Sequence, residues 1–211
     1  MFFVWLSCLA AIFVYLRVQA PSYKRFALLI ILLSILETIG NSISFFGRIK
    51  NLFFFNFVFA IELIALPFFY RSWLHSAGLK KVIPVYLIIF PLFALINWFF
   101  IQRFYTLHTY DFVFGGAFVL LLSIAYLWEL YTNEGAKNIL RDPVFWFSIA
   151  YFTFFSVSVP YYGMMNYLLT NHRDFAGLYY EIMMDGAICL TNVLLTIGFL
   201  CILIPAKEPE S

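Results

Sequence analysis

Seven apolar stretches separated by short polar connections occupy almost the whole chain. A helix needs about 20 mainly apolar residues to cross the hydrocarbon core of a bilayer, and in lipid only helices and closed barrels satisfy every backbone polar group. The pattern predicts an all-α polytopic membrane protein, a seven-transmembrane-helix bundle forming one domain over 1–204 with a short polar cytoplasmic tail over 205–211. The stretches are Met1–Leu16, Phe26–Phe46, Leu52–Ser72, Val82–Ile101, Phe112–Tyr131, Phe145–Leu168 and Leu178–Ile204.

The composition agrees with lipid as the solvent of the folded chain. Hydrophobic residues make up 64% of the 211 residues and charged residues 11%, whereas soluble domains carry about 25% charged residues. The formal net charge of +2 is too small to indicate nucleic-acid binding. Cys8, Cys189 and Cys201 all lie in apolar stretches and are expected to be reduced packing residues, because free cysteine behaves as a small hydrophobe.

The basic residues predict the orientation of the chain. If the N-terminus lies outside, nine of the 13 Lys and Arg residues fall in inner connections or the tail, and the connection with Arg48 and Lys50 is the local exception. Cytoplasmic loops are enriched in Lys and Arg. We therefore expect a multi-pass protein of the bacterial inner (plasma) membrane with its N-terminus outside and its C-terminus in the cytoplasm. In the opening stretch the charge follows the apolar run, at Arg17, which favours an uncleaved helix over a signal peptide.

Two glutamates, Glu37 and Glu62, lie at the centres of apolar stretches. A charged group at the bilayer midplane costs at least about 2.5 kcal/mol, and such groups face a bundle interior or a cavity. Arg71 follows Glu62 by nine residues, roughly 13 Å along a helix, which is too far for a direct pair. We expect the two glutamates either to be protonated or to meet a cation or a ligand rich in hydrogen-bond donors.

Polar side chains recur at helical spacing on the second, sixth and seventh stretches, as at Ser34, Glu37, Asn41 and Ser44. Polar stripes on apolar membrane helices face one another rather than lipid. In the expected orientation most of these groups lie in the outer half, which predicts an outward-facing polar pocket floored by the two glutamates. The candidate ligand-binding residues are Glu37, Asn41, Asn56, Glu62, Asn97, Tyr162, Asn166, Glu181, Asp185 and Asn192.

Two local signals concern packing and the membrane interface. The adjacent Gly115 and Gly116 predict a close helix contact rather than a hinge. Glu129, near the inner end of the fifth stretch, is expected to be an interfacial residue.

The sequence contains no recognisable catalytic or metal-binding motif. The histidines are His75, His108 and His172, all in predicted connections on different sides, and there is no HExxH pattern. The serines lack a histidine partner, and the seventh stretch has no lysine for a Schiff base. We expect no catalytic residue, no metal site and no cofactor.

The layout of seven short-looped helices resembles the N-terminal seven-helix sensor region of some bacterial membrane histidine kinases. Two segments, NLFFFNFVFAIELIALPFFYRSWL (Asn51–Leu74) and KNILRDPVFWFSIAYFTFF (Lys137–Phe155), also resemble small bacterial seven-transmembrane-helix proteins of uncharacterised function. The resemblance implies a sensor. Since the sequence holds no dimerisation helix, ATP-binding domain or other output domain, any signal is expected to leave through a separate partner.

These features favour a receptor or sensor-like membrane protein whose acidic pocket takes a small cationic or polar ligand. The signal would be read by a membrane or cytoplasmic protein partner at the inner connections, which hold Arg71, Lys80, Lys81, Lys137 and Arg141. A proton- or cation-coupled transporter is an alternative, since midplane acids suit such transport. A non-catalytic subunit of a membrane complex is another. The glutamates could also be neutral acids that hold the bundle together through hydrogen bonds to Asn and Tyr.

Overall fold

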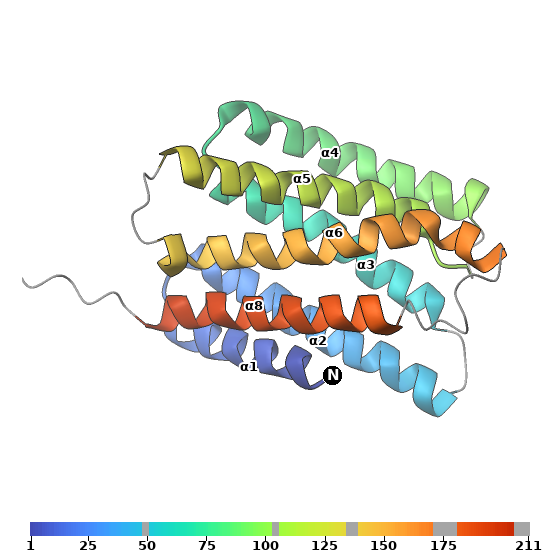
Figure 1. The fold of residues 1–211 in the computed structure, drawn as a ribbon, viewed down its shortest axis with the longest axis horizontal. Coiled ribbons are helices and arrows are strands. Elements are labelled where there is room, and N and C mark those ends of the chain that lie inside the picture. Colours follow the sequence, from blue (N-terminus) through green and yellow to red (C-terminus); the bar gives the residue numbers. More distant parts are fainter. Residues whose placement is uncertain (48–50, 103–105, 134–138, 171–180, 205–211) are drawn as a thin grey trace, which may run out of the picture.

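The chain folds into long helices, with no β-strand among the residues that the structure describes (Figure 1). This computed structural model describes residues 1–47, 51–102, 106–133, 139–170 and 181–204. The all-α prediction is therefore confirmed. The long helices are α1 (Phe2–Arg17), α2 (Pro21–Gly47), α3 (Leu52–Trp73), α4 (Ala77–Ile96), α5 (Thr109–Asn133), α6 (Pro143–Thr170) and α8 (Gly186–Leu203).

Short helical turns extend or precede three of the long helices. A π-helical turn, η1 (Asn97–Ile101), continues α4, and a second one, η4 (Glu181–Asp185), leads into α8. A 3₁₀ turn, η2 (Ile139–Arg141), precedes α6. Asp142 then caps α6, because its carboxylate accepts a hydrogen bond from the backbone N–H of Val144 at 3.0 Å.

Six helices of the described chain are long and apolar enough to cross a membrane, which marks a multi-pass membrane protein. The seventh apolar helix, α1, has only 16 residues. At 1.5 Å per residue it reaches about 24 Å, less than the roughly 30 Å of a bilayer core. The six candidate spans are Pro21–Ile43, Leu52–Trp73, Ala77–Ile101, Thr109–Thr132, Pro143–Met165 and Ile182–Leu203.

Six of the long helices form a closed ring. Neighbouring contacts run from α1 to α2, α3, α5, α6 and α8, and α8 packs back against α1. Helix α4 packs on the outside of this ring, against α3 and α5. In Figure 1, α4 lies at one edge beside α5, and α1 lies at the other beside α8. Helix α4 therefore does not line the interior of the ring.

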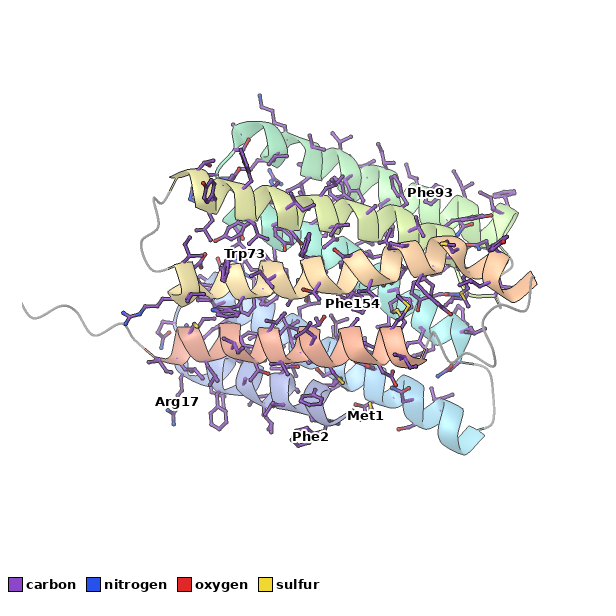
Figure 2. All side chains as sticks on the ribbon, in the orientation of Figure 1. Met1, Phe2, Arg17, Trp73, Phe93 and Phe154 are labelled. Atoms are coloured by element: carbon purple, nitrogen blue, oxygen red, sulfur yellow. The ribbon has the colours of Figure 1, made fainter. Side chains whose placement is uncertain are left out.

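Helix α1 covers only one half of the bundle. Its first residue lies near the middle of the long axis, at the N label in Figure 1 and at Met1 in Figure 2, and the helix runs from there to Arg17. Beyond Met1, α2 and α8 continue without α1 between them (Figure 1). The two halves of the ring interior are consequently built differently.

The half that contains α1 is filled by aromatic side chains from four helices of the ring. The ring of Phe26 on α2 lies 5.1 Å from Trp73, 4.5 Å from Phe147 and 5.9 Å from Phe199, measured between centroids. Figure 2 labels Trp73 in this half. Phe26, Phe147 and Phe199 are fully buried. We call Phe26, Phe69, Trp73, Phe147 and Phe199 the aromatic layer.

A hydrogen-bonded hub lies beside the aromatic layer and joins three helices. The hydroxyl of Tyr70 on α3 lies 2.8 Å from the hydroxyl of Ser123 on α5 and donates to Ser148 on α6 at 3.3 Å. All three residues are buried. These three hydroxyls therefore bond to one another within the protein, as buried hydroxyls in lipid require. Among the described residues, the buried indole N–H of Trp73 in the same half has no hydrogen-bond partner.

Gly115 and Gly116 lie at a close helix contact, as predicted. A Cβ atom on Gly115 would lie 2.8 Å from side-chain atoms of Leu63 and Phe90, and one on Gly116 would lie 2.8 Å from Phe155. Helix α5 can approach its neighbours this closely because both residues lack a side chain.

Glu129 on α5 holds the connection between α3 and α4. Its carboxylate accepts hydrogen bonds from the backbone N–H groups of His75 at 2.6 Å and Ser76 at 2.8 Å. The residue is buried. Its role in the structure is to cap the start of α4, in addition to any position at a membrane interface.

Candidate functional site

A cavity of about 820 Å³ lies inside the ring, beside the first turn of α1 and extending into the half that α1 leaves open. Five long helices line it, namely α1, α2, α3, α6 and α8, together with the turn η4. Its rim includes Asn51, Leu52 and Met184, which lie where α3 begins and where η4 meets α8. Its deep end includes Glu62, Tyr151 and Leu195.

Three carboxylates face this cavity: Glu37 on α2, Glu62 on α3 and Asp185 in η4. No lysine or arginine lines it. Among the described residues, neither Glu37 nor Glu62 makes a hydrogen bond or an ion pair with a protein group. Both glutamates line the same cavity. The cavity wall therefore carries three carboxylates and no lysine or arginine side chain, and the N-terminal ammonium of Met1, which also lines it, attracts the carboxylate of Glu37.

Amide and hydroxyl groups add polarity around the carboxylates. Asn41 and Asn51 lie toward the rim, while Ser34, Thr191 and Asn192 lie deeper. Asn192 is fixed in place, because its Oδ1 accepts a hydrogen bond from Ser7 on α1 at 2.6 Å. Its Nδ2 donates to the carbonyl of Ile188 at 2.9 Å. Asn192 therefore ties α1 to α8 and offers little free hydrogen-bonding capacity to a ligand.

The remainder of the cavity wall is aromatic and aliphatic. Phe55 and Phe59 come from α3, and Phe154 and Tyr161 come from α6. Figure 2 shows Phe154 in the central part of the bundle, at the same level as Met1. A pocket of this kind combines a large apolar surface with a few acidic groups, which is the usual make-up of a small-molecule site.

The cavity ends where the aromatic layer and the Tyr70 hub begin. Glu37 and Glu62 lie at one level along the antiparallel helices α2 and α3, eleven residues from Phe26 and Trp73 respectively. The rings of Phe26 and Trp73 are in contact across the interior. Glu62 consequently lies near the closed end of the cavity, whereas Ile30, Leu33 and Ser34 line it between Glu37 and that end.

Six of the ten predicted site residues line the cavity: Glu37, Asn41, Glu62, Tyr162, Asp185 and Asn192. The side chains of two others, Asn166 and Glu181, lie outside the described residues.

The remaining two predicted residues, Asn56 and Asn97, lie outside the cavity. Asn56 donates to the carbonyl of Thr106 at 2.7 Å and accepts from the N–H of His108 at 3.0 Å. Asn97 donates to Gln102 at 3.0 Å. Both asparagines satisfy groups of the connection between α4 and α5 and are not available to the cavity.

A second buried polar cluster, which the sequence did not reveal, lies at this connection. The imidazole Nδ1 of His108 lies 3.5 Å from the carboxylate of Asp111, and both side chains are buried. The indole of Trp98 donates to the same carboxylate at 2.8 Å. A histidine and an aspartate three residues apart at the start of a helix are only a weak signal of a buried cluster, because both residue types also occur in exposed connections.

Several cavity residues were also absent from the predicted set. Ser34 belongs to the predicted stripe of the second stretch, Tyr151 lies in the sixth stretch, and Thr191 is one residue away from Asn192. Phe55, Phe59 and Phe154 could not be identified, because this chain has 28 phenylalanines and most have the same local context. Within the described part of the chain, no group of three or more His, Cys, Asp or Glu side chains could hold a metal ion.

The fold and the cavity define a multi-pass helical membrane protein with an acidic, aromatic-lined interior. No protein-family model, curated protein or solved structure matches the chain.

Proposed function

We propose that this protein is a receptor or sensor-like membrane protein that binds a small organic cation in its cavity. One observation carries the proposal: Glu37 and Glu62 face an 820 Å³ cavity whose wall holds no lysine or arginine side chain. An uncompensated carboxylate in the membrane interior is costly. A ligand that brings a positive charge would remove this cost on binding.

The rest of the wall favours a cation that also has an apolar part. Phe55, Phe59, Phe154 and Tyr161 provide apolar surface and aromatic faces, and such faces attract ammonium groups. The cavity volume falls within the range of about 300–1,000 Å³ that is typical of small-molecule sites. An amine with a hydrocarbon or aromatic body matches both the acidic floor and this wall.

The filled half of the ring favours a receptor over a transporter. Beyond Glu62, the aromatic layer closes the interior, and Tyr70, Ser123 and Ser148 bond to one another. A transported solute would have to displace this layer. A receptor needs only to pass a small movement of α3 to its far end, where Glu129 holds the connection to α4. We propose that a separate partner reads this movement at that end.

Thermal unfolding of the purified full chain in detergent tests the proposal. The probes are primary amines with alkyl or phenyl bodies, together with alcohols of the same shape. We expect an amine to raise the midpoint of wild-type unfolding and its matching alcohol to leave it unchanged. The Glu37→Gln/Glu62→Gln variant should lose the shift. Glu129→Gln neutralises an acid outside the cavity. The amine should raise its unfolding midpoint, measured against the same variant without amine, as much as it raises that of the wild type.

The same variants separate receptor from transporter. In liposomes, a receptor should bind the amine without moving it across the bilayer. Amine uptake that depends on Glu37 and Glu62 would replace the receptor proposal with transport. Equal shifts in the wild type and the Glu37→Gln/Glu62→Gln variant would refute a cation site at these carboxylates.

A further inference from the structure

A second, smaller groove of about 310 Å³ lies between α2 and α3, at the opposite end of the helices from the cavity rim. It is next to the aromatic layer and shares Phe69 with it. Two arginines and two serines dominate its polar part. The residues lining it are Ser22 and Arg25 of α2 and Phe68, Phe69, Arg71 and Ser72 of α3.

The groove concentrates positive charge. Arg25 and Arg71 come from different helices and lie in the same wall, and no acidic residue lines the groove. Within the described chain neither guanidinium forms an ion pair, and the Nε of Arg25 donates only to the carbonyl of Pro21, at 3.2 Å. Two guanidinium groups that converge on one space are suited to an oxyanion, because each can donate paired hydrogen bonds to phosphate oxygens.

An exposed apolar surface continues from the basic groove along both helices. On α2, Leu28 and Leu32 follow Arg25 by three and seven residues, on the same helix face, and are 50% and 43% exposed. On α3, Phe68 precedes Arg71 by three residues and is 50% exposed. Both helices are candidate membrane spans, and the arginines lie near the ends of those spans. The apolar surface therefore faces the hydrocarbon when the arginines are at headgroup level.

We propose that this groove binds an anionic phospholipid, with its phosphate between Arg25 and Arg71 and an acyl chain along Phe68 and Leu28. A lipid fits better than a free phosphate, because only a lipid covers the apolar surface that adjoins the basic groups. Basic pockets between membrane helices commonly take such headgroups. This inference does not rest on the function proposed for the cavity.

Native mass spectrometry of the full chain in detergent tests the groove, with phosphatidylglycerol and phosphatidylcholine as probes. We expect wild-type protein to retain phosphatidylglycerol in preference to phosphatidylcholine. Arg25→Gln/Arg71→Gln should bind phosphatidylglycerol about thirtyfold more weakly, if each arginine contributes as a basic residue near an anionic surface does. Lys80→Gln/Lys81→Gln makes the same charge change on α4, outside the groove, and should bind as the wild type does.

Three results would overturn the proposal. If the arginine and lysine double variants lost phosphatidylglycerol binding equally, the lipid would be attracted only generally to the basic end of the bundle. Equal retention of the two lipids by the wild type would show no headgroup selectivity. Inorganic phosphate or glycerol phosphate that displaces phosphatidylglycerol at equal concentration would show a site for soluble phosphate.

A measurement on the wild type alone covers the case in which the arginine variant does not fold. Phenylglyoxal modifies accessible arginines, and the extent at each position can be read by peptide mass spectrometry. We expect phosphatidylglycerol to slow modification of Arg25 and Arg71 and to leave Arg17 unaffected, since Arg17 does not line the groove. Equal modification of Arg25 and Arg71 with and without the lipid would contradict the site.

Discussion

At the scale of single residues, the acids of this chain differ in what their oxygens contact. The carboxylate of Glu129 accepts two backbone N–H groups, and that of Asp142 accepts from Val144 and from the hydroxyl of Tyr126. Glu37 and Glu62 face the cavity and contact no described donor. Glu129 and Asp142 therefore stabilise the fold. The carboxylate oxygens of Glu37 and Glu62 remain available to a ligand.

This difference predicts opposite effects of removing the two kinds of acid. Glu129→Ala leaves the N–H groups of His75 and Ser76 without their acceptor and should lower the free energy of unfolding by about 1.5–3 kcal/mol, the usual value for bonds to charged groups. Glu62→Gln should leave the ligand-free protein at least as stable as the wild type. Denaturant unfolding in mixed micelles measures both. If Glu129→Ala left the free energy of unfolding unchanged, the capping role of Glu129 would be refuted.

At the residue scale, helical periodicity in the sequence predicts which side chains share one face of a helix. Glu37 and Asn41 lie on one face of α2, and Asp185 and Asn192 lie seven residues apart, about two turns, so each pair reaches the same cavity. It failed for Asn56, which contacts the connection after residue 105. That contact depends on how a distant segment crosses the bundle, and the spacing along α3 carries no information about it.

At the scale of helices, close packing of α5 depends on its glycines, and a matched pair of substitutions tests this. A Cβ at Gly116 would lie 2.8 Å from Phe155, whereas one at Gly163 on α6 would lie 3.9 Å from its nearest neighbour, Val113. We expect Gly116→Ala to lower the free energy of unfolding by about 1–3 kcal/mol through overpacking. Gly163→Ala should be neutral or stabilising by up to about 1 kcal/mol, because alanine favours helix.

The two variants should be compared by denaturant titration in the same detergent. Equal stabilities for Gly116→Ala and Gly163→Ala would mean that α5 and α6 can separate without cost, and the tight contact would be wrong. The sequence predicted a contact at the glycine pair but not its partners, since it could not place α3, α4 and α6 around α5.

At the scale of the whole molecule, the ring arrangement decides which predicted polar residues can form a site. Six helices enclose the interior and α4 lies outside it, so Asn97, in the turn that continues α4, does not reach the cavity. Hydropathy gives α4 the same character as the ring helices α2, α3, α5, α6 and α8, because all are long and apolar. The sequence therefore predicted an all-helical chain of apolar helices, of which six are long enough to span a membrane, but not which of them would be peripheral.

The short α1 and the aromatic layer give the molecule two different halves. The half with α1 is filled, as shown by the contacts of Phe26 with Trp73, Phe147 and Phe199. The cavity, with the two glutamates in its wall, begins beside the first turn of α1 and extends into the other half. The receptor proposal rests on this difference between the halves, because a transported solute would have to displace the aromatic layer beyond the cavity.

The central claim, that Glu37 and Glu62 form a cation site, is tested most directly by an equilibrium binding titration. The amine that most stabilises the wild type is titrated into wild type and Glu62→Gln, with its alcohol analogue as the uncharged control. Removing one partner of a buried charge pair costs about 2–5 kcal/mol, so we predict at least about thirtyfold weaker amine binding to Glu62→Gln and no measurable binding of the alcohol to either protein. Equal amine affinities for the two proteins would contradict the claim.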